Sequence, residues 1–469
     1  MHITPCRAAL CAVIAIAPGC VDRGDDLDAT ADSTVSERAS PLLAQGKRLF
    51  EEPLPHSNGR SCATCHVMDE HTALSPENVE ARLAADPSDP LFHRLDADDP
   101  TAATLTFDHL RMGLVRVTLP LPANMDLIDL QGNVVTPPHR TISVWRSVPS
   151  IQNTAVTGPY QLDGRAANLS VQAQDAITVH SEGPVLPGHK LDQIAAFESA
   201  QFSSARAAFV ATLIRLGVAP EDVPIPEQTM ALNEQERRGR DVYNLACGTC
   251  HGGATTNQIV DRAIHDALFH ELQPNGNMVF DVLPDQGPVA RTVPHEGEAL
   301  NTGVGILSGY GQMGLIPSGN DSIELPRYRF RFYTDGTRRQ QVTDLPPVPV
   351  TASGDPNDLT PALDERGAPI VGPSQGVQWF STDPGRAAIT GDPLDFEAFD
   401  VPQLRGIAHT APYFHDNNSR TLRDVVDLYS RFILVGLGLP EHPPEQPGGQ
   451  PEMLSVQQKQ DLLAFLNRL

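Results

Sequence analysis

The pattern Cys-x-x-Cys-His occurs twice in this chain of 469 residues, at positions 62–66 and 247–251. This pattern attaches haem covalently, because its two thiols can form thioethers with the vinyl groups and its histidine can ligate the iron. A single copy could also mark a zinc site or a redox dithiol. Zinc, however, needs four converging ligands, usually from two pairs close in sequence, and these two histidines lie 251 − 66 = 185 residues apart. We therefore expect two covalently bound haem c groups, held by Cys62, Cys65 and His66 and by Cys247, Cys250 and His251.

The remaining composition narrows the class of protein. Three further cysteines, Cys6, Cys11 and Cys20, lie near the N-terminus, so no pair is left for a disulfide once that segment is removed. The net charge of −24 argues against binding nucleic acid through its phosphates. It favours a basic partner such as a small electron-donor protein, although acidity that only maintains solubility is the simpler explanation.

The N-terminus has the features of an export signal. An apolar run at 8–17 follows a basic residue and is itself followed by Pro-Gly and Cys20. We interpret residues 1–20 as a signal peptide for the periplasm and residues 21–39 as a disordered tether. The same pattern matches a lipoprotein signal, which would leave Cys20 as a lipid anchor. No later stretch has the roughly 18 apolar residues that are needed to span a membrane.

A helix is expected directly before each Cys-x-x-Cys-His motif. Gly46 and Phe50, on an apolar helical face before the first motif, match Gly239 and Tyr243 before the second. The chain thus contains an internal repeat of helix, short loop and haem motif. A third helix begins at Ser455 with a capping-box pattern. In small cytochromes a first and a last helix cross over the haem, and a glycine at the crossing permits close approach.

The expected fold is mainly α, with two cytochrome-c-like haem domains, long irregular loops and a minor β ribbon. The loops follow from 42 Pro and 36 Gly, and the alternation of apolar and polar residues at 114–119 predicts the ribbon. A Pro-rich stretch at 219–228 indicates a boundary. We place an N-terminal haem domain at 40–225 and a C-terminal haem domain at 226–469.

Five short segments carry more specific information. They are Asn-Gly-Arg-Ser at 58–61, Arg-Ser-Val-Pro at 146–149, Asp-Gly-Arg-Ala at 163–166, Asp-Pro-Gly-Arg at 383–386 and Thr-Ala-Pro-Tyr-Phe-His-Asp at 410–416. In type and order they resemble the bacterial dihaem cytochrome c peroxidases and their MauG-type relatives. The resemblance implies a division of labour, in which the N-terminal haem reacts with hydrogen peroxide and the C-terminal haem stores and delivers electrons.

The same resemblance implies residues for the peroxide site. The family has a Gln in the helix after Asp-Gly-Arg-Ala and a Glu ten residues later, and here these are Gln172 and Glu182. A carboxylate beside bound peroxide can take a proton from one oxygen and return it to the other. His180 is the competing acid–base group. Some family members also ligate the N-terminal iron through a histidine at the position of His139, for which a simple loop residue is the alternative interpretation.

The second haem needs a second axial ligand. Classical members place a Met fourteen residues after the His of Phe-His-Asp, whereas this chain has Tyr429 there, as the MauG-type branch does. A phenolate is a hard anionic donor, so it stabilises oxidised iron and lowers the potential relative to Met. Met313, which follows His251 by 62 residues, is the competing ligand, and a core aromatic is the other interpretation of Tyr429.

Two positions depart from the family pattern. Many relatives have a Trp between the haems directly before Asp-Gly-Arg-Ala, and this chain has Leu162 there, with Tyr160 as the nearest aromatic substitute. The family also binds calcium with an Asn that Ser147 replaces here. Thr410 and Pro412 of that calcium site are retained, so a calcium ion remains an expectation.

The leading prediction is a periplasmic dihaem peroxidase that reduces hydrogen peroxide with electrons from a small cytochrome c or cupredoxin. A first alternative is the MauG-type oxidation of a side chain in a partner protein, driven by peroxide. A second alternative is a dihaem electron carrier without catalysis. Family members are often dimers, so a homodimer is a further expectation.

Overall fold

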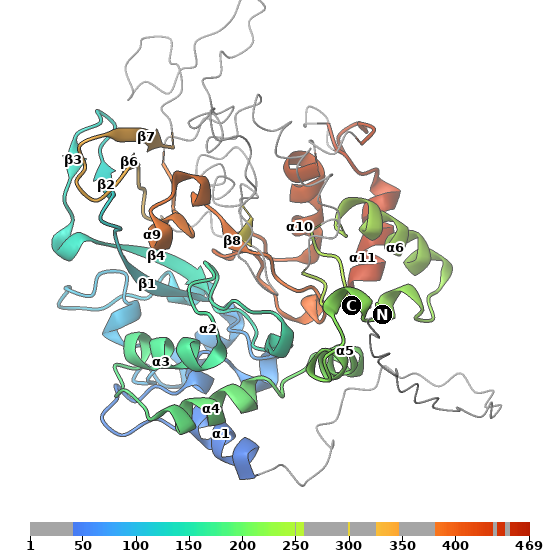
Figure 1. Ribbon diagram of the computed structural model, residues 1–469, viewed down its shortest axis with the longest axis horizontal. Helices are drawn as coiled ribbons and strands as arrows, with labels where there is room; N and C mark the ends of the chain where they lie inside the picture. Colours follow the sequence, from blue (N-terminus) through green and yellow to red (C-terminus); the bar gives the residue numbers. More distant parts are fainter. Residues whose placement is uncertain are drawn as a thin grey trace, which may run out of the picture. The chain divides into compact units, whose positions relative to one another are not determined.

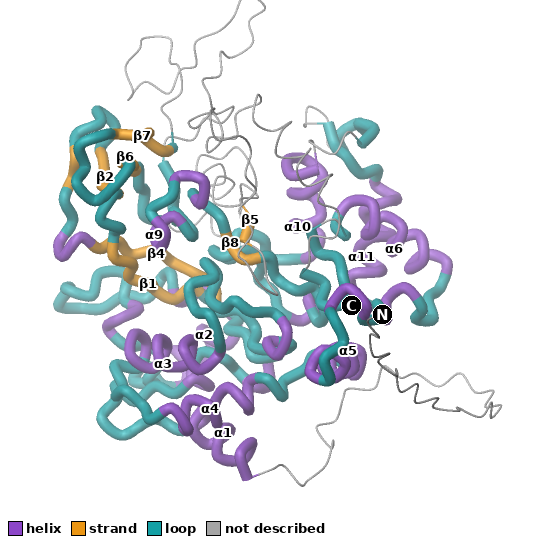
Figure 2. The backbone as a smooth tube through the Cα atoms, viewed as in Figure 1, coloured by secondary structure: helices purple, strands orange, loops and turns teal. Residues whose placement is uncertain are grey.

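The computed structural model describes residues 41–248, 250–257, 299–300, 325–346, 380–434, 439–445 and 451–469 (Figure 1). The described residues all belong to one compact unit. The predicted signal peptide and tether lie outside them. Helices make up most of the regular structure in this part of the chain, strands are short, and loops connect most elements (Figure 2). This agrees with the predicted mainly α fold with long loops.

Two pairs of helices cross with a glycine at the contact, and each pair includes the helix before a haem motif. The first pair is α1 (Pro41–Glu51) with α4 (Gly188–Glu198), and the second is α6 (Glu234–Ala246) with α11 (Val456–Leu466) (Figure 1). A Cβ added to Gly46 would overlap the backbone of α4, and one added to Gly239 would overlap the backbone of α11. Only glycine permits backbones to lie this close. The predicted helix before each motif is present, and a glycine lies at the crossing in each pair, although the sequence did not predict α4.

The helices start at the capping residues that the sequence indicates. Asn233 Oδ1 accepts the Glu236 N–H at 2.9 Å to form the capping box of α6, and Ser455 caps α11 in the same way. Further α-helices in the described residues are α2 (Pro76–Ala85), α3 (Leu169–His180), α5 (Ala205–Arg215), α9 (Ala387–Thr390) and α10 (Leu422–Leu428). After α10 the chain continues into a π-helical turn, Tyr429–Ile433.

The strands form small antiparallel sheets. The predicted ribbon is present as β1 (Leu114–Pro120) paired with β4 (Thr141–Ser147). A four-stranded sheet has the order β3 (Val134–Val135), β2 (Met125–Ile128), β6 (Phe330–Tyr333) and β7 (Gln341–Leu345), and β5 (Ala299–Leu300) pairs with β8 (Phe399–Asp400). Because β2 precedes the predicted domain boundary and β6 follows it, this sheet joins segments from both sides.

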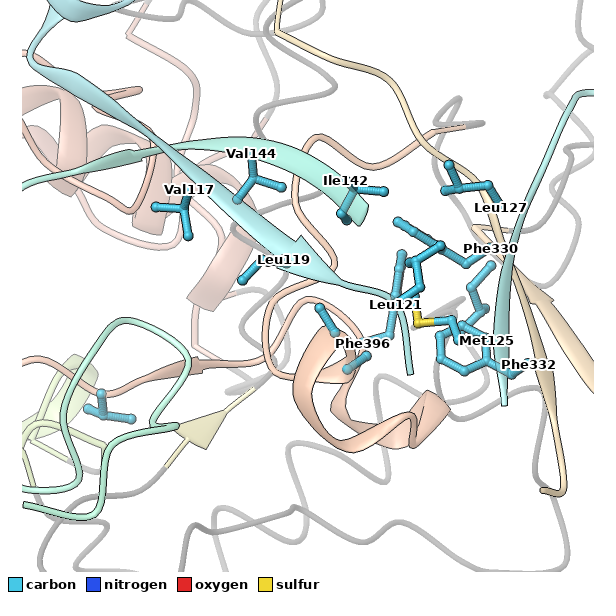
Figure 3. Packing of buried hydrophobic residues seen from close by; sticks show 14 residues of the cluster. Val117, Leu119, Leu121, Met125, Leu127, Ile142, Val144, Phe330, Phe332 and Phe396 are labelled. Atoms are coloured by element: carbon cyan, nitrogen blue, oxygen red, sulfur yellow. The ribbon is translucent and has the colours of Figure 1, made fainter. Parts of the chain in front are cut away.

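An apolar cluster packs the ribbon against β2 and β6 (Figure 3). Phe396 meets Phe330 and Phe332 edge-on, with ring centroids 6.1 and 6.3 Å apart. Cys250 of the second haem motif packs against the same cluster. The sheet region therefore supports one side of the second motif.

Candidate haem sites

A buried ion-pair network joins three of the segments that carry the family resemblance. Arg146 donates from Nη1 to Asp163 Oδ2 at 2.6 Å and from Nε to Asp383 Oδ2 at 2.6 Å. Nη1 of Arg386 donates to the carbonyl oxygen of Asp163 at 2.9 Å. Burial acts to raise the pKa of Asp163, but the charges of Arg146 and Arg165 outweigh it and lower that pKa. Loss of one member would leave a buried charge unpaired, so the network holds these segments together.

The first haem motif begins with a 3-10 turn, Cys62–Thr64. Nδ1 of His66 lies 3.0 Å from the carbonyl oxygen of Thr72. A carbonyl only accepts hydrogen bonds, so Nδ1 carries the proton and Nε2 remains available to bind iron. Burial lowers the pKa of His66 and raises the pKa of Cys65 to about 11. The motif therefore presents a neutral imidazole and uncharged thiols.

The second motif repeats this arrangement. Nδ1 of His251 lies 3.0 Å from the carbonyl oxygen of Pro402, which again leaves Nε2 for the metal. Burial lowers the pKa of His251 to about 4 and raises the pKa of Cys247 to about 12. None of the four motif cysteines is in a disulfide. The donors at both motifs therefore fit a covalently attached haem.

A second internal repeat directly precedes helices α3 and α10, and the sequence patterns did not predict it. Tyr160 pairs with Ala166 across a tight loop, and Tyr413 pairs with Ser419 in the same way. The hydroxyls of Tyr160 and Tyr413 each donate to the carbonyl six residues earlier, at 2.7 and 2.9 Å. The N-cap residues of α3 and α10 follow the two tyrosines at the same distance, 168 − 160 = 421 − 413 = 8 residues. The two loops and their helices can thus be aligned residue by residue.

This alignment matches Ala176 in α3 with Tyr429 after α10, since 176 − 160 = 429 − 413 = 16. Tyr429 packs in the apolar cluster that includes Cys247, and its ring stacks on Phe414 with centroids 6.4 Å apart. Burial raises the pKa of Tyr429, and charges on Cys247 and Cys250 would raise it further. The phenol therefore lies close to the second motif, whereas the matching position near the first motif carries only a methyl group.

Helix α3 carries the residues predicted for the peroxide site. Gln172, Ala176 and His180 are spaced four residues apart, so they share one face of the helix. On the neighbouring face Ile177 packs in the apolar cluster that includes Cys62. Helix α3 therefore lies against the first haem motif.

His180 and Glu182 end this segment in different surroundings. Burial lowers the pKa of His180, and His180 is close enough for its charge to lower the pKa of His66. Glu182 has a left-handed backbone with φ 48°, and its side chain is 52% exposed. Its Oε2 lies 3.7 Å from Nε2 of His93. The structure thus places His180 towards the first motif and Glu182 beside His93 at the solvent.

For four other predicted residues, the structure gives little information about the predicted role. His139 is exposed in a 3-10 turn between β3 and β4. Thr410 Oγ1 donates to the carbonyl oxygen of Ile407 at 3.3 Å, and Pro412 directly precedes the second tyrosine loop. Met313 lies outside the described residues. The roles of these residues remain predictions.

The segment around Leu162 contains an aromatic pair. The carbonyl oxygen of Leu162 accepts the Asp400 N–H at 2.8 Å. The neighbouring Phe399 stacks on His415, with ring centroids 4.2 Å apart. Tyr160, the substitute expected from the sequence, uses its hydroxyl to bond the backbone of its own loop. Phe399 and His415 are therefore the aromatic residues that the fold brings next to the position of the family Trp.

Glu198 is a buried carboxyl group that the sequence analysis missed. It is 3% exposed, and its Oε2 has no hydrogen-bond partner among the described residues. Burial raises the pKa of Glu198 to about 8, and its charge adds to the effect of burial in raising the pKa of Cys62. The one available signal was its place on the apolar face of α4, four residues after buried Ile194.

Glu198→Gln is expected to stabilise the protein at neutral pH and to have no effect near pH 4. The folded pKa of about 8 lies above the unfolded value of 4.5, so the folded state holds its proton more tightly and loses stability as pH rises between these values. Glutamine removes that loss, a gain on the order of 4 kcal/mol at pH 7.5. Unfolding measured from pH 4 to pH 8 checks this, and a pH-independent difference between the two proteins would contradict it.

Within the described residues, no helix is both long enough and apolar enough to cross a membrane. No family model matches the chain. Over 93 residues the chain is 39% identical to the cytochrome-c peroxidase IdrP2 of Denitromonas iodatirespirans, a match that covers 19% of this chain and 21% of that protein. Over 50 residues it is 44% identical to the cytochrome c551 peroxidase of Nitrosomonas europaea, covering 11% of this chain and 15% of that protein.

These matches span about a fifth or less of the length of the curated relatives. A solved structure of a MauG-like protein associated with microbial copper homeostasis is 18% identical, with 93% of this chain and 90% of that chain covered and a TM-score of 0.37. The sequence matches agree with the resemblance carried by the five short segments. Over the matched segments the chain is thus similar to bacterial cytochrome c peroxidases.

Proposed function

We propose that this protein is a dihaem c-type peroxidase, which reduces hydrogen peroxide with electrons from a small donor protein. The observation that carries the proposal is the difference between the two haem sites at matching positions, Ala176 in the first and Tyr429 in the second. A site closed by a phenol suits electron storage, whereas a site bordered by a methyl group leaves room for peroxide. The N-terminal haem is accordingly the peroxide-reacting one, and electrons pass to it from the C-terminal haem.

The residues of the two motifs would hold the haems. When bound, each haem would supply redox chemistry at its iron. The carbonyl oxygens of Thr72 and Pro402 orient His66 and His251, so that Nε2 of each ring is the ligand atom. Tyr429 is the further residue that we propose would bind the iron of the second haem.

Reduction of hydrogen peroxide to two water molecules consumes two protons and two electrons, so the first site also needs a proton-transfer group. We assign this role to Glu182 and the binding of peroxide to Gln172. The half-exposed carboxyl of Glu182 can exchange protons with water, and its Oε2 lies 3.7 Å from Nε2 of His93. His180 is the competing group, because burial lowers its pKa and keeps its imidazole neutral, the form that accepts a proton.

Glu182→Gln is expected to lower peroxide turnover by about 100-fold, the scale of a lost general acid–base group. The measurement is the oxidation of a reduced cytochrome c by peroxide in protein that carries two haems. His180→Gln is the matched control, and its turnover should stay within about tenfold of the wild type. A larger loss in His180→Gln would move the role to His180. Absence of turnover in the fully loaded wild type would overturn the peroxidase proposal in favour of a non-catalytic electron carrier.

Oxidation of a partner protein is a second candidate, favoured by Tyr429 beside the second motif. It differs from the first candidate in what supplies the electrons. If peroxide is consumed together with a protein substrate, and a cytochrome c or cupredoxin donor stays reduced, the partner-oxidising activity is the correct one.

Several finer features belong to this proposal. They are two haem domains at 40–225 and 226–469, a periplasmic location with Cys20 as a lipid anchor, a homodimer, and calcium at Thr410 and Pro412. Calcium is tested by chelation, because activity that is unaffected in a calcium-free protein would remove the ion from the proposal.

A further inference from the structure

Lys459 in α11 is a buried ammonium group that the proposed chemistry does not use. Its side chain is fully buried, and Nζ contacts Asp427 Oδ1 at 2.8 Å, Glu445 Oε1 at 3.2 Å and a carboxylate oxygen of Glu452. The three carboxylates have the spacing of a cation site. The ammonium group of Lys459 is the cation that they surround.

Two arginines complete this charge cluster. Nε of Arg423 donates to Asp427 at 3.0 Å and its Nη2 donates to Glu445 at 2.5 Å. Nε of Arg431 donates to Glu452 Oε1 at 3.4 Å. With Lys459, three cationic groups balance three carboxylates. Lys459 and Glu452 are buried, so loss of either one would leave the other's charge unpaired in the interior, whereas Asp427 and Glu445 are partly exposed.

The cluster holds the chain on both sides of Tyr429. The carboxylate of Asp427, on α10, lies two residues before Tyr429. Directly after Tyr429, the buried Ser430 donates from Oγ to Glu452 Oε2 at 3.3 Å, and the same Oγ accepts the Leu454 N–H at 3.0 Å. The carbonyl oxygen of Ser430 also accepts the Met453 N–H at 2.8 Å.

The backbone changes its helical form at this point. Helix α10 ends at Leu428, and Tyr429–Ile433 forms a π-helical turn. A π-helical turn widens the helix locally and so redirects its side chains, and such turns are frequent at functional sites. We propose that Lys459 and its carboxylates position Tyr429 by holding this turn, which keeps the phenol directed at the second haem. This inference rests on the proposed function, in which Tyr429 is an axial ligand.

The test uses the protein loaded with two haems, confirmed by haem content. Tyr429→Phe is expected to change the absorption and EPR spectra of one of the two oxidised haems. Lys459→Met, which removes the ammonium group and keeps an unbranched side chain, is expected to produce the same change. The double variant Lys459→Met/Tyr429→Phe should have the spectrum of Tyr429→Phe alone, because Lys459 acts through Tyr429.

Two further variants make the test specific. Ser430→Ala removes the Oγ contacts to Glu452 and Leu454 without stranding the ammonium group, and should shift part of the same haem signal. Asp461→Asn is the matched control, because this carboxylate lies on the same helix but pairs with Nε of Arg238 on α6 at 2.8 Å. Its spectrum should be that of the wild type.

The outcomes separate this inference from the function on which it rests. An unchanged spectrum in Tyr429→Phe would remove the axial ligand and overturn both the ligand assignment and the positioning role. A changed spectrum in Tyr429→Phe, with wild-type spectra in Lys459→Met and Ser430→Ala, would overturn the positioning role alone. Additive changes in the double variant would also overturn it. If Lys459→Met fails to retain two haems, Ser430→Ala and the double variant Ser430→Ala/Tyr429→Phe replace it in the test. The positioning role then predicts that this double variant has the spectrum of Tyr429→Phe alone.

Discussion

Replacing Ala176 by tyrosine is expected to close the first haem site and to lower peroxide turnover by about 100-fold or more, the scale of a lost essential group. Ala176 and Tyr429 each lie eight residues after the N-cap of their helix, 176 − 168 = 429 − 421 = 8. A phenol at position 176 would occupy the room proposed for peroxide and offer the first iron a second ligand. Peroxide turnover and the EPR signal of the first haem are the measurements.

Ala176→Phe separates ligation from bulk, because it has nearly the same size and no hydroxyl. It should slow turnover and leave the first haem without the new ligand signature. The reciprocal variant Tyr429→Ala should open the second haem to added small ligands. Wild-type turnover in Ala176→Tyr would mean that the two helices do not occupy matching places over their haems.

Replacing Gly239 by alanine is expected to destabilise the protein by about 3 kcal/mol, at the upper end of the usual cost of overpacking. The added Cβ would overlap the carbonyl of Asp461 and lie 2.9 Å from Cβ of Phe465, both in α11. The contacted atoms belong to the backbone and the core, so the overlap can be relieved only if the two helices move apart. A lower midpoint of thermal unfolding, together with partial loss of the second haem, is the expected result.

Gly188→Ala is the matched control for this substitution. Gly188 begins α4, and a Cβ there would meet nothing within 4 Å. Alanine at this position should leave stability unchanged or raise it by about 0.5 kcal/mol, since it restricts the unfolded chain. Equal effects of the two substitutions would show that the crossing at Gly239 is not tightly packed.

Much of the helical framework could be predicted, because its signals are local. The capping boxes at Asn233 and Ser455 depend on residues three positions apart, and both form as expected. The haem motifs are contiguous, so the thiols and the imidazole of each lie in one turn. The close helix crossings could be predicted from Gly46 and Gly239, because these glycines occupy matching positions on the apolar faces of the two helices before the haem motifs. A glycine at such a position permits another helix to approach closely.

The supports of the site could not be predicted in this way. The carbonyl that orients His251 comes from Pro402, 402 − 251 = 151 residues later. The sheet that supports the second motif pairs Leu127 with Phe330. No spacing rule connects such residues, because their contact depends on how the whole chain packs. Glu198 was missed for the same reason, since only burial gives it a shifted pKa.

The sequence by itself determined the two haem motifs, the helices before them and the five short segments that carry the family resemblance, because each depends on neighbouring residues. It also nominated Tyr429 and Glu182 through that resemblance. Only the tertiary structure decided that Tyr429 packs against the second motif, that Ala176 takes the matching place near the first, and that Lys459 lies among carboxylates of α10 and the later chain. These arrangements depend on buried contacts between segments that are distant in the sequence. Burial and charge pairing act together in such contacts, and no local sequence pattern predicts them.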